Sequence, residues 1–400
     1  MKNKVLLGMS GGVDSSTSAI LLQQKGYEVI GCTMILHNDN KSAEDAKKVC
    51  EKLGIKHYIC DYKNEFKCHV IGNFIEEYQN ARTPNPCVEC NKYLKFGAFY
   101  QKAKELGCDY IATGHYARVE YSEKYQRHVL KKSNEEKKDQ TYFLYKVPKE
   151  EIEHIIFPLQ DYKNKEDIRN LASKYALDVA KKKDSQEICF IPDNDYQKFL
   201  LKHIKKCPKE GNIVLKTGEV LGKHKGLINY TIGQRKGIGI SYKEPLYVIK
   251  LDNKKNEVVV GTEEDLYAKK LYAEEINWLV FDNAPKKLEC LAKIRYRAKE
   301  AKAVVYASEN GVTVEFEEPQ RAITPGQSIV FYDEEGIVLG GGKINFEKNL
   351  VLKSQLWYKY TIKIKLNLER RNFCGRRNRK RCKDNINCWR WTTNCRYIGL

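Results

Sequence analysis

The sequence predicts a multidomain α/β protein, and three observations support this class. The chain has 400 residues, which is more than one hydrophobic core usually accommodates. Strand-like and helix-like segments alternate over the first 200 residues, which is typical of a parallel sheet covered by helices. From about Gly211 the pattern changes to short strands separated by turn residues, which indicates small antiparallel β domains.

The N-terminal region carries the alternation in its clearest form. An apolar run is followed by a glycine turn and then by a segment of helical periodicity. In order, the sequence predicts a strand at Lys4–Met9, a helix at Ser15–Gln24, a strand at Tyr27–Thr33, a helix at Ala43–Leu53, and strands at Lys56–Cys60 and Asp109–Ala112. Because ligands of open α/β sheets bind beyond the carboxyl ends of the strands, we expect the functional site at that edge.

The later strands are short and are separated by Gly, Asn, Pro and Lys. They are predicted at Val214–Leu221, Tyr247–Leu251, Glu257–Gly261, Ala292–Tyr296, Lys302–Val305, Val312–Phe316, Ser328–Tyr332 and Ile337–Leu339. A helix at Tyr196–Lys206 ends before Pro208 and marks the first domain boundary, and Glu263–Tyr267 marks the second. We therefore expect domains at residues 1–207, 208–268 and 269–348, followed by a tail at residues 349–400.

Positive charge is concentrated in this tail. The net charge is +19, and residues 349–400 hold 14 Lys and Arg against only Glu369 and Asp384. No periodicity persists beyond about Leu368, and the tail cysteines lack the paired spacing of a zinc module. We interpret the tail as unstructured or non-native, with a basic RNA-binding arm as the alternative. The modest positive excess of the remaining chain suits a polyanionic partner such as a nucleic acid.

The composition excludes several classes of protein. With 42% hydrophobic and 31% charged residues, the chain is neither disordered nor fibrous. No apolar run reaches the roughly 18 residues that span a bilayer, and glycine and serine follow the N-terminus too closely for a secretory signal. We expect a cytoplasmic protein with no membrane partner, whose 14 cysteines act as thiols, metal ligands or catalytic groups. Cys32 and Cys60 lie in apolar strands and are predicted to be core residues.

The strongest local motif is Ser10-Gly11-Gly12-Val13-Asp14-Ser15, between a predicted strand and a predicted helix. Its glycines let backbone N–H groups approach an anion, and the start of the following helix favours negative charge. The serines add hydroxyl donors, and Asp14 can hold Mg²⁺ against phosphate oxygens. The lysine of a Walker loop and the GxGxxG pattern are both absent. The motif therefore predicts a phosphate-binding loop of another kind.

This loop resembles the pyrophosphatase loop of enzymes that adenylate an oxygen and release pyrophosphate. Further motifs narrow the resemblance to the bacterial tRNA-specific 2-thiouridylases; the full set is Gly8–Ser15, Met34, Ala81–Lys92, Ala112–Tyr116, Lys138–Gln140, Lys183–Ile191, Thr231–Gly237, Arg295–Tyr296 and Pro325–Gln327. The match extends to about residue 346, and the tail has no counterpart. The resemblance implies a parallel-sheet domain like that of the adenine-nucleotide α-hydrolases, a small central domain and a C-terminal β-barrel.

The implied reaction places sulfur on C2 of uridine 34 in the anticodon of a tRNA. Because the C2 oxygen is a poor leaving group, the resemblance implies that it is first adenylated by ATP with release of pyrophosphate. The implied cofactors are ATP and Mg²⁺, and the loop stabilises the charge of the departing pyrophosphate. The implied nucleotide-binding residues are Gly8, Met9, Ser10, Gly11, Gly12, Val13, Asp14, Ser15, Met34 and Gly114.

The resemblance assigns the sulfur chemistry to two cysteines. Cys189 accepts sulfur as a persulfide. Cys90 is the nucleophile that either releases sulfide from Cys189 or ends in a Cys90–Cys189 disulfide, which a reductant reopens. The expected sulfur source is a cysteine desulfurase or a sulfur-relay protein.

Cys87 departs from the family pattern, in which this position is often Asp. It creates the stretch Cys87-Val88-Glu89-Cys90. Together with Cys189 it supplies three thiolates that could hold a [4Fe-4S] cluster with one iron open to sulfide. The persulfide and cluster hypotheses both remain open at the level of sequence. A zinc site is disfavoured, since no fourth ligand of the right type is nearby in the sequence.

The RNA contacts are also implied by the resemblance. An anticodon loop offers single-stranded bases that can be splayed out, and the target uridine must leave its stack to react. The flipped base is expected to meet Asn85, Pro86 and Cys87. Other tRNA contacts are expected at His115, Lys138, Asp139, Gln140, Arg295, Tyr296 and Gln327. The expected substrates are the Lys, Glu and Gln acceptors.

Two other functions remain open. A different adenylating enzyme of this loop class, such as a ligase or amidotransferase, would not need Cys90 and Cys189. A tRNA-binding protein that has lost catalysis would not need the intact Ser10–Ser15 loop.

Overall fold

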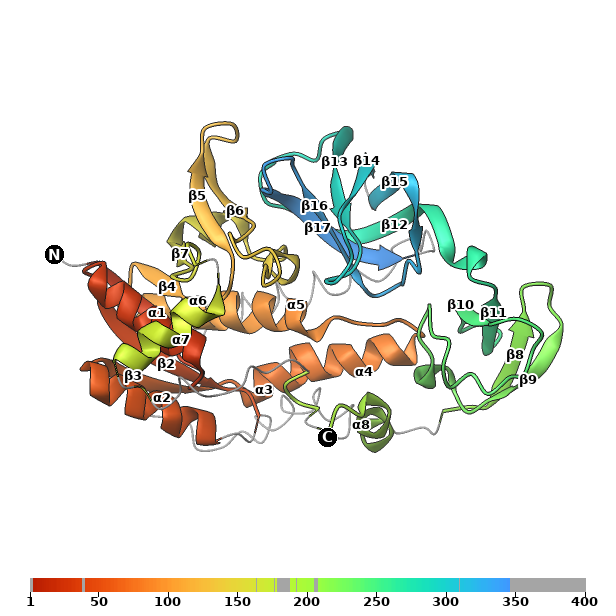
Figure 1. Cartoon of the computed structure of the whole chain (residues 1–400), viewed down its shortest axis with the longest axis horizontal. Coiled ribbons are helices and arrows are strands. Elements are labelled where there is room, and N and C mark those ends of the chain that lie inside the picture. Colours follow the sequence, from red (N-terminus) through yellow and green to blue (C-terminus); the bar gives the residue numbers. More distant parts are fainter. Residues whose placement is uncertain are drawn as a thin grey trace, which may run out of the picture. The chain divides into compact units, whose positions relative to one another are not determined.

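The computed structural model describes residues 3–37, 40–162, 164–175, 177, 188–191, 193–204, 208–308 and 310–345. The chain divides into two units, Met1–Phe346 and Glu347–Leu400. The predicted tail at residues 349–400 therefore lies outside the described residues. The first unit contains a five-stranded parallel sheet, a four-stranded sheet and a closed antiparallel barrel (Figure 1). The predicted fold class is confirmed.

The N-terminal sheet is parallel, with the strand order β3-β2-β1-β4-β7. Its strands are β1 Lys4–Gly8, β2 Glu28–Ile35, β3 Lys56–Asp61, β4 Tyr110–Ala112 and β7 Ile155–Ile156. The order reverses at β1, because the chain adds β2 and β3 on one side and β4 and β7 on the other. The carboxyl ends of β1 and β4 thus form the switch point at which such sheets bind ligands.

Alternating side chains of β1 pack against helices on both faces of the sheet. Val5 and Leu7 share a core with α1 (Val13–Gln24), α2 (Asn40–Leu53) and α7 (Lys165–Lys174). Leu6 belongs to a second core, which includes α6 (Phe99–Glu105). The predicted strands and both predicted helices of this region are confirmed, although α1 begins two residues earlier than expected. The cysteines predicted as core residues, Cys32 and Cys60, are buried.

The sequence analysis did not predict the helices between residues 63 and 105. They are α3 Lys63–Phe66, the π-helical η1 Lys67–Ile71, α4 Gly72–Gln79, α5 Pro86–Cys90, the π-helical η2 Asn91–Ala98, and α6. Their apolar side chains pack with Phe190 and with Leu200 of α8 (Tyr196–His203), about a hundred residues further along the chain. Pro86 takes the first position of α5, where proline's fixed φ suits a helix.

Smaller elements complete this part of the chain. A hairpin is formed by β5 Arg118–Ser122 and β6 Arg127–Lys131, and short 3₁₀ helices occur at η3 Thr141–Phe143 and η4 Lys149–His154. The helix expected at Tyr196–Lys206 is present as α8 to His203, and residues 205–207 lie outside the described residues.

The central sheet has the order β10-β11-β8-β9. Its strands are β8 Gly211–Leu215, β9 Val220–His224, β10 Tyr247–Asp252 and β11 Glu257–Gly261, with short 3₁₀ helices at η6 Leu227–Asn229 and η7 Glu264–Leu266. The single strand predicted at Val214–Leu221 is wrong, because a turn divides it into β8 and β9. Gly218 adopts a φ of +94° there, and the Leu215 N–H donates to the Glu219 carbonyl at 2.8 Å.

The barrel closes in the order β12-β15-β14-β13-β16-β17. Its strands are β12 Tyr267–Trp278, β13 Lys287–Lys293, β14 Ala301–Ser308, β15 Gly311–Arg321, β16 Ser328–Tyr332 and β17 Val338–Asn345. The strand predicted at Ala292–Tyr296 is wrong in register, since β13 ends at Lys293 and a turn follows in which the Ala298 N–H donates to the Arg295 carbonyl. The long strand β12 was not predicted because about half of its side chains face solvent or the barrel ends.

The barrel contacts the N-terminal sheet domain directly. Val330 and Tyr332 of β16 belong to the same buried core as Leu6 of β1. The Thr83 N–H donates to the Pro325 carbonyl at 2.9 Å, and Gln327 Nε2 donates to the Thr83 carbonyl at 2.9 Å. The barrel therefore holds the loop that leads into α5.

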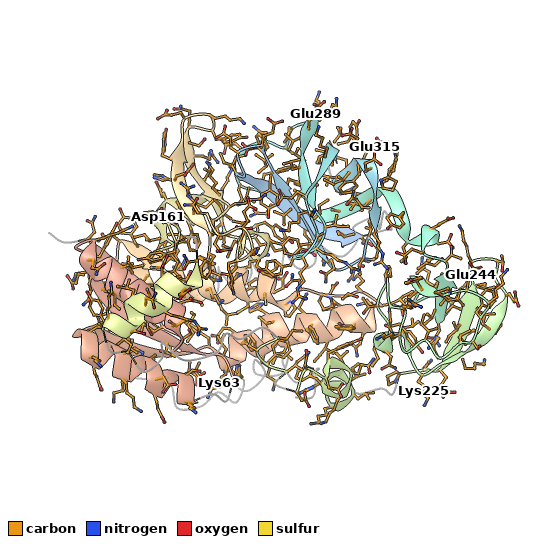
Figure 2. All side chains as sticks on the ribbon, viewed as in Figure 1. Lys63, Asp161, Lys225, Glu244, Glu289 and Glu315 are labelled. Atoms are coloured by element: carbon orange, nitrogen blue, oxygen red, sulfur yellow. The ribbon has the colours of Figure 1, made fainter. Side chains whose placement is uncertain are left out.

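Charged side chains lie on the outside of these domains. Lys225, Glu244 and Glu289 are exposed at the surface (Figure 2). Within the described ranges, no helix combines the length and apolarity needed to cross a bilayer.

The contact between barrel and loop predicts that Gly326→Ala destabilises the protein. Gly326 has a φ of +88°, and an added Cβ would lie 2.9 Å from both the nitrogen and the oxygen of Thr83. Backbone atoms cannot move aside cheaply, so we expect a loss of about 1–3 kcal/mol in the free energy of unfolding. Thermal or urea unfolding of the full chain measures it.

The matched control is Gly218→Ala, which has a φ of +94° but no atom within 4 Å of its added Cβ. It shares the backbone strain without the collision. Equal losses in the two variants would contradict a close approach of the barrel to the loop.

Candidate active site

The phosphate-binding loop lies at the switch point of the sheet, between the end of β1 and the start of α1. The Ser10 N–H donates to Ser15 Oγ at 3.2 Å, and that hydroxyl donates to the Gly12 carbonyl at 3.1 Å. No side chain caps the N-terminus of α1. Gly11 has a φ of +64°, and a Cβ there would lie 2.5 Å from the Ser42 carbonyl oxygen. The loop is therefore held open by its own serines, with helix N–H groups directed at the position of an anion.

Residues from other strands meet the loop at the same edge. A Cβ on Gly114 would lie 3.1 Å from both the Asp14 carbonyl carbon and the Ser15 nitrogen. A Cβ on Gly8 would lie 3.5 Å from Met34 Cε, at the end of β2. The structure thus brings together the loop, Met34 and Gly114, as the resemblance implies. Met9 and Val13 differ from the rest of the loop because their side chains are buried in the core behind it.

Tyr116 fixes the carboxylate of the loop. Its hydroxyl donates to Asp14 Oδ1 at 3.0 Å, and its backbone N–H donates to Gln140 Oε1 at 2.9 Å. In return the Gln140 N–H donates to the Tyr116 carbonyl at 2.9 Å. Asp14 is consequently oriented by a residue that the sequence analysis quoted in a motif but did not assign to the site.

Three cysteines from two distant segments share a second site. Cys87 and Cys90 are on α5, whereas Cys189 precedes Phe190, which belongs to the same apolar cluster as Cys90. Burial raises the pKa of Cys90 to about 12, and Cys189 and Cys87 act in the same direction. All three are free thiols. The pair of residues predicted to be catalytic is therefore brought together in the fold.

The thiols differ in accessibility. Cys90 is buried, whereas Cys87 and Cys189 are exposed at the surface. The protein atoms around them nevertheless raise the pKa of each thiol, and the charge of Lys95 opposes this shift. A thiol whose pKa lies above neutrality is mostly protonated at pH 7, so the resting site holds thiols rather than thiolates.

The donor set does not fit a metal cluster. In the part of the chain that the structure describes, no three His, Cys, Asp or Glu side chains gather closely enough to hold a metal ion. Cys87, Cys90 and Cys189 interact through their charges without converging on one point.

The residues predicted to contact tRNA are largely engaged within the protein. His115 is buried, and its Nδ1 lies 2.7 Å from Thr113 Oγ1. Asp139 is buried and accepts from the Ser133 N–H at 3.1 Å and from Thr141 Oγ1 at 2.7 Å. Their contact with tRNA remains a prediction, and in the free protein both support neighbouring loops.

The predicted contacts on the barrel also make internal bonds. Arg295 donates to the carbonyls of Ile232 and Ala322 at 3.2 and 3.0 Å, which joins the central sheet domain to the barrel. Tyr296 packs on Phe143, with ring centroids 4.5 Å apart. With Gln327 bonded to the loop at Thr83, these residues lie around the entrance to α5 rather than on a separate RNA-binding face.

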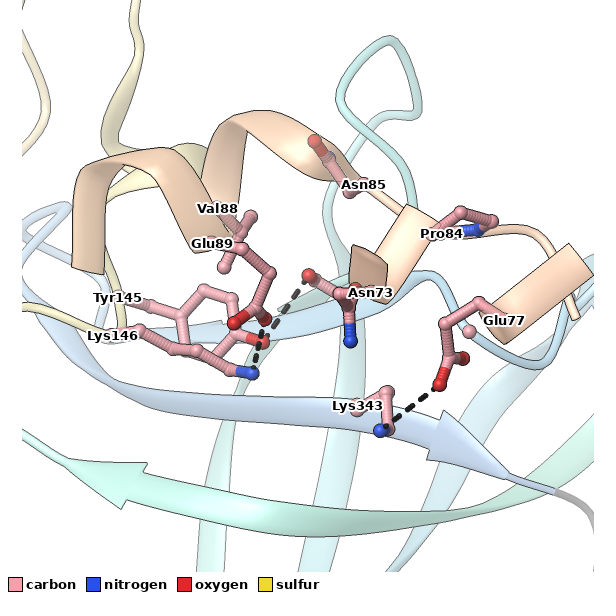
Figure 3. Close-up of a pocket in the computed structure, with 11 residues that line it drawn as sticks. Asn73, Glu77, Pro84, Asn85, Val88, Glu89, Tyr145, Lys146 and Lys343 are labelled. Carbon is pink, nitrogen blue, oxygen red and sulfur yellow. Dashed lines mark hydrogen bonds and ion pairs between the residues drawn. The ribbon is translucent and has the colours of Figure 1, made fainter. Parts of the chain in front are cut away.

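A small pocket beside α5 contains charged residues that the sequence analysis missed (Figure 3). Lys146 Nζ lies 2.7 Å from Glu89 Oε1 and 3.1 Å from Glu275 Oε2, and Lys343 Nζ lies 3.6 Å from Glu77 Oε1. Burial alone would raise the pKa of Glu275, but the two lysines hold it at about 2. No local pattern marks these residues, because the partners are up to about 270 positions apart.

The comparisons with known proteins agree with this site. Three family models match successive parts of the chain: the tRNA methyl transferase HUP domain at residues 3–193, the tRNA methyl transferase PRC-barrel domain at 197–262, and the aminomethyltransferase beta-barrel domain at 268–344. The three regions correspond to the parallel-sheet domain, the central sheet and the barrel.

Two curated relatives match over almost their whole length. The tRNA-specific 2-thiouridylase MnmA of Clostridioides difficile (strain 630) is 47% identical over 363 residues, which cover 88% of this chain and 99% of the relative. That of Clostridium botulinum (strain Alaska E43 / Type E3) is 49% identical over 357 residues, covering 86% and 98%.

A solved structure titled as a predicted subunit of tRNA methyltransferase, from Methanocaldococcus jannaschii DSM, is 20% identical. It covers 43% of this chain and 76% of its own, with a TM-score of 0.29, and adds nothing to the argument. The sequence relatives are decisive, and they confirm the resemblance noted from the motifs: the chain belongs to the family of the tRNA-specific 2-thiouridylases.

Proposed function

We propose that this protein is an ATP-dependent sulfurtransferase that converts the wobble uridine 34 of tRNA to 2-thiouridine. The observation that carries the proposal is the adjacency of a phosphate-binding loop and a cluster of thiols. The tripeptide Thr113-Gly114-His115 joins them: Gly114 lies against the start of α1, and His115 reaches Lys95 beside the cysteines. An amidating enzyme of the same loop class would have no use for the second site.

The first half-reaction activates the uridine. The C2 oxygen forms a bond to the α-phosphorus of ATP while the bond from that phosphorus to the bridging oxygen of the β-phosphate breaks, which yields an adenylated base and pyrophosphate. The N–H groups of the first turn of α1, with the hydroxyls of Ser10 and Ser15, stabilise the charge that develops on pyrophosphate. Gly114 lacks the side chain that would press on this turn.

A magnesium ion fits the loop as a partner of the phosphates. Asp14 would hold it together with phosphate oxygens, and the ion would neutralise charge on the leaving group. The Tyr116 hydroxyl keeps the Asp14 carboxylate in a fixed orientation.

The second half-reaction supplies sulfur from a persulfide on Cys189. The Cys90 thiolate attacks the Cys189 sulfur, which forms a Cys90–Cys189 disulfide and expels the outer sulfur as hydrosulfide. Hydrosulfide then bonds to C2 of the base, the bond from C2 to oxygen breaks, and AMP leaves with that oxygen. A dithiol reductant restores both thiols and takes up the oxidising equivalent. The exposed position of Cys189 suits loading by a cysteine desulfurase or a relay protein.

The persulfide route is favoured over the [4Fe-4S] alternative. The three cysteines do not converge as ligands of one cluster within the described residues. Cys87 then lies beside the transfer site as part of the surface that receives the flipped base, with Asn85 and Pro86.

The remaining assignments complete the proposal. We infer a catalytic domain at residues 1–207, a central tRNA-binding domain at 208–268 and a barrel domain at 269–348. The tRNAs for Lys, Glu and Gln are the inferred substrates. The predicted contacts Lys138, Asp139, Gln140, Arg295, Tyr296 and Gln327 would act at the edge of the anticodon site, where several already shape the loops.

Replacing Tyr116 by Phe tests the nucleotide site. The variant loses one hydrogen bond to the Asp14 carboxylate while its ring still fills the core, so we expect about a tenfold weaker affinity for Mg–ATP. Equilibrium binding of a fluorescent ATP analogue measures it. Tyr142→Phe, which removes a buried hydroxyl bonded to the Ser328 carbonyl, is the control and should bind ATP normally.

Replacing either cysteine by serine tests the sulfur site. The assay supplies full-length protein, Mg–ATP, an unmodified tRNA for Lys, Glu or Gln, and a persulfide donor; 2-thiouridine is detected by its retardation in a mercury gel. Cys90→Ser and Cys189→Ser are each expected to lower the yield by more than about a hundredfold. Both should retain tRNA-dependent exchange of pyrophosphate into ATP, because adenylation does not use the thiols.

The control is Cys108→Ser, which alters a half-buried thiol away from the site. It should thiolate normally. Wild-type yields from Cys90→Ser or Cys189→Ser would refute the assignment of sulfur transfer to these residues.

A further inference from the structure

The helix that follows the catalytic stretch has an unusual winding. α5 ends at Cys90, and residues Asn91–Ala98 continue as the π-helix η2. A π-helix closes its hydrogen bonds between residues five apart, so each turn contains an extra residue. In an α-helix, a residue five positions after Cys90 would point roughly 140° away from it. The wider winding instead returns Lys95 to the side of the helix that carries Cys90.

The amine of Lys95 is held by a buried histidine. Lys95 Nζ lies 3.4 Å from His115 Nε2, and His115 Nδ1 lies 2.7 Å from Thr113 Oγ1. Burial and the charge of Lys95 hold the pKa of His115 well below its usual range, so the ring is neutral. Since an ammonium can only donate, Nε2 accepts from Lys95 and Nδ1–H donates to Thr113. Phe96 and Phe157 pack on the ring and fix its plane.

The surroundings leave this charge directed at sulfur. Among the described residues, no carboxylate lies within ion-pair distance of Lys95, whereas its charge acts on Cys87, Cys90 and Cys189 alike. The nearest acidic residue of α5, Glu89, is bound by Lys146. The other lysine at the start of η2, Lys92, lies over the ring of Tyr93 at 4.7 Å and acts on His69 instead.

We propose that Lys95 is the resident cation of the sulfur-transfer site, where its ammonium stabilises the negative sulfur that forms on Cys90 and Cys189, and that His115 is the residue that positions it. This inference rests on the proposed function, because it gives a role to the cysteines that carry the sulfur. It also gives His115 a role besides the predicted contact with tRNA. A thiolate and a persulfide anion each carry one negative charge, so one ammonium serves both.

The test measures thiolate formation without the reaction. Full-length protein without tRNA is treated with iodoacetamide between pH 7 and 10, and the rate at each cysteine is followed by peptide mass spectrometry. Lys95→Gln keeps an N–H donor for His115 but removes the charge. We expect alkylation of Cys90 and Cys189 at pH 8 to slow about tenfold, since one pKa unit changes the thiolate fraction tenfold below the pKa.

Two variants control for position and for charge. Lys92→Gln removes the same charge from the same helix and should leave the profiles unchanged. Lys95→Arg keeps the charge and should retain most of the reactivity. Cys290, in strand β13 of the barrel, serves as an internal reference and would react faster if a variant unfolded.

The outcomes separate this inference from the proposed function. Unchanged profiles at Cys90 and Cys189 in Lys95→Gln would overturn it. If that variant unfolds, Lys95→Arg decides, because a tenfold loss of reactivity in a folded Lys95→Arg protein would mean that charge is not what matters. If instead Cys90→Ser and Cys189→Ser thiolate normally, the proposed sulfur route fails while the alkylation profiles still report the effect of Lys95.

Discussion

The close approach of Gly114 to the first turn of α1 is the constraint on which both sites depend. A methyl group at this position would lie 3.1 Å from the backbone of Asp14 and Ser15, so the strand end and the helix start can meet only through glycine. Residues on either side of Gly114 then have fixed places. Tyr116 reaches Asp14, and His115 points toward Lys95. One short segment thereby sets the distance between the nucleotide and the thiols.

The barrel provides the second constraint, on the opposite side of the thiols. Its hydrogen bonds to Thr83 hold the entrance to α5, and Lys146 ties Glu89 of that helix to Glu275 of β12. Removing one member of a buried ion pair typically costs about 3–5 kcal/mol, so this link is firm. The loop that carries Cys87 and Cys90 is therefore supported by residues more than 180 positions away, which explains why a catalytic stretch rich in proline adopts one conformation.

The sequence predicted the parts of the molecule that local chemistry determines. The loop at Ser10–Ser15 follows from glycine freedom and helix-start electrostatics, and the resemblance located Cys90 and Cys189. The helices at residues 63–105 escaped prediction because they are stabilised by Phe190 and Leu200, far along the chain. Lys95 escaped because α-helical spacing places it away from Cys90. His115 was identified, but only its burial reveals what its ring contacts.

The difference in depth between Cys189 and Cys90 has a consequence for timing. An outer sulfur on exposed Cys189 can be installed by a donor protein while Cys90, buried and protonated at neutral pH, does not attack it. Sulfur is then not lost as sulfide between encounters with RNA. The protein can be charged in advance and stored in that form, and discharge waits until the incoming base changes the surroundings of the inner thiol. Supply and demand for sulfur are thus separated in time by a few ångströms of burial.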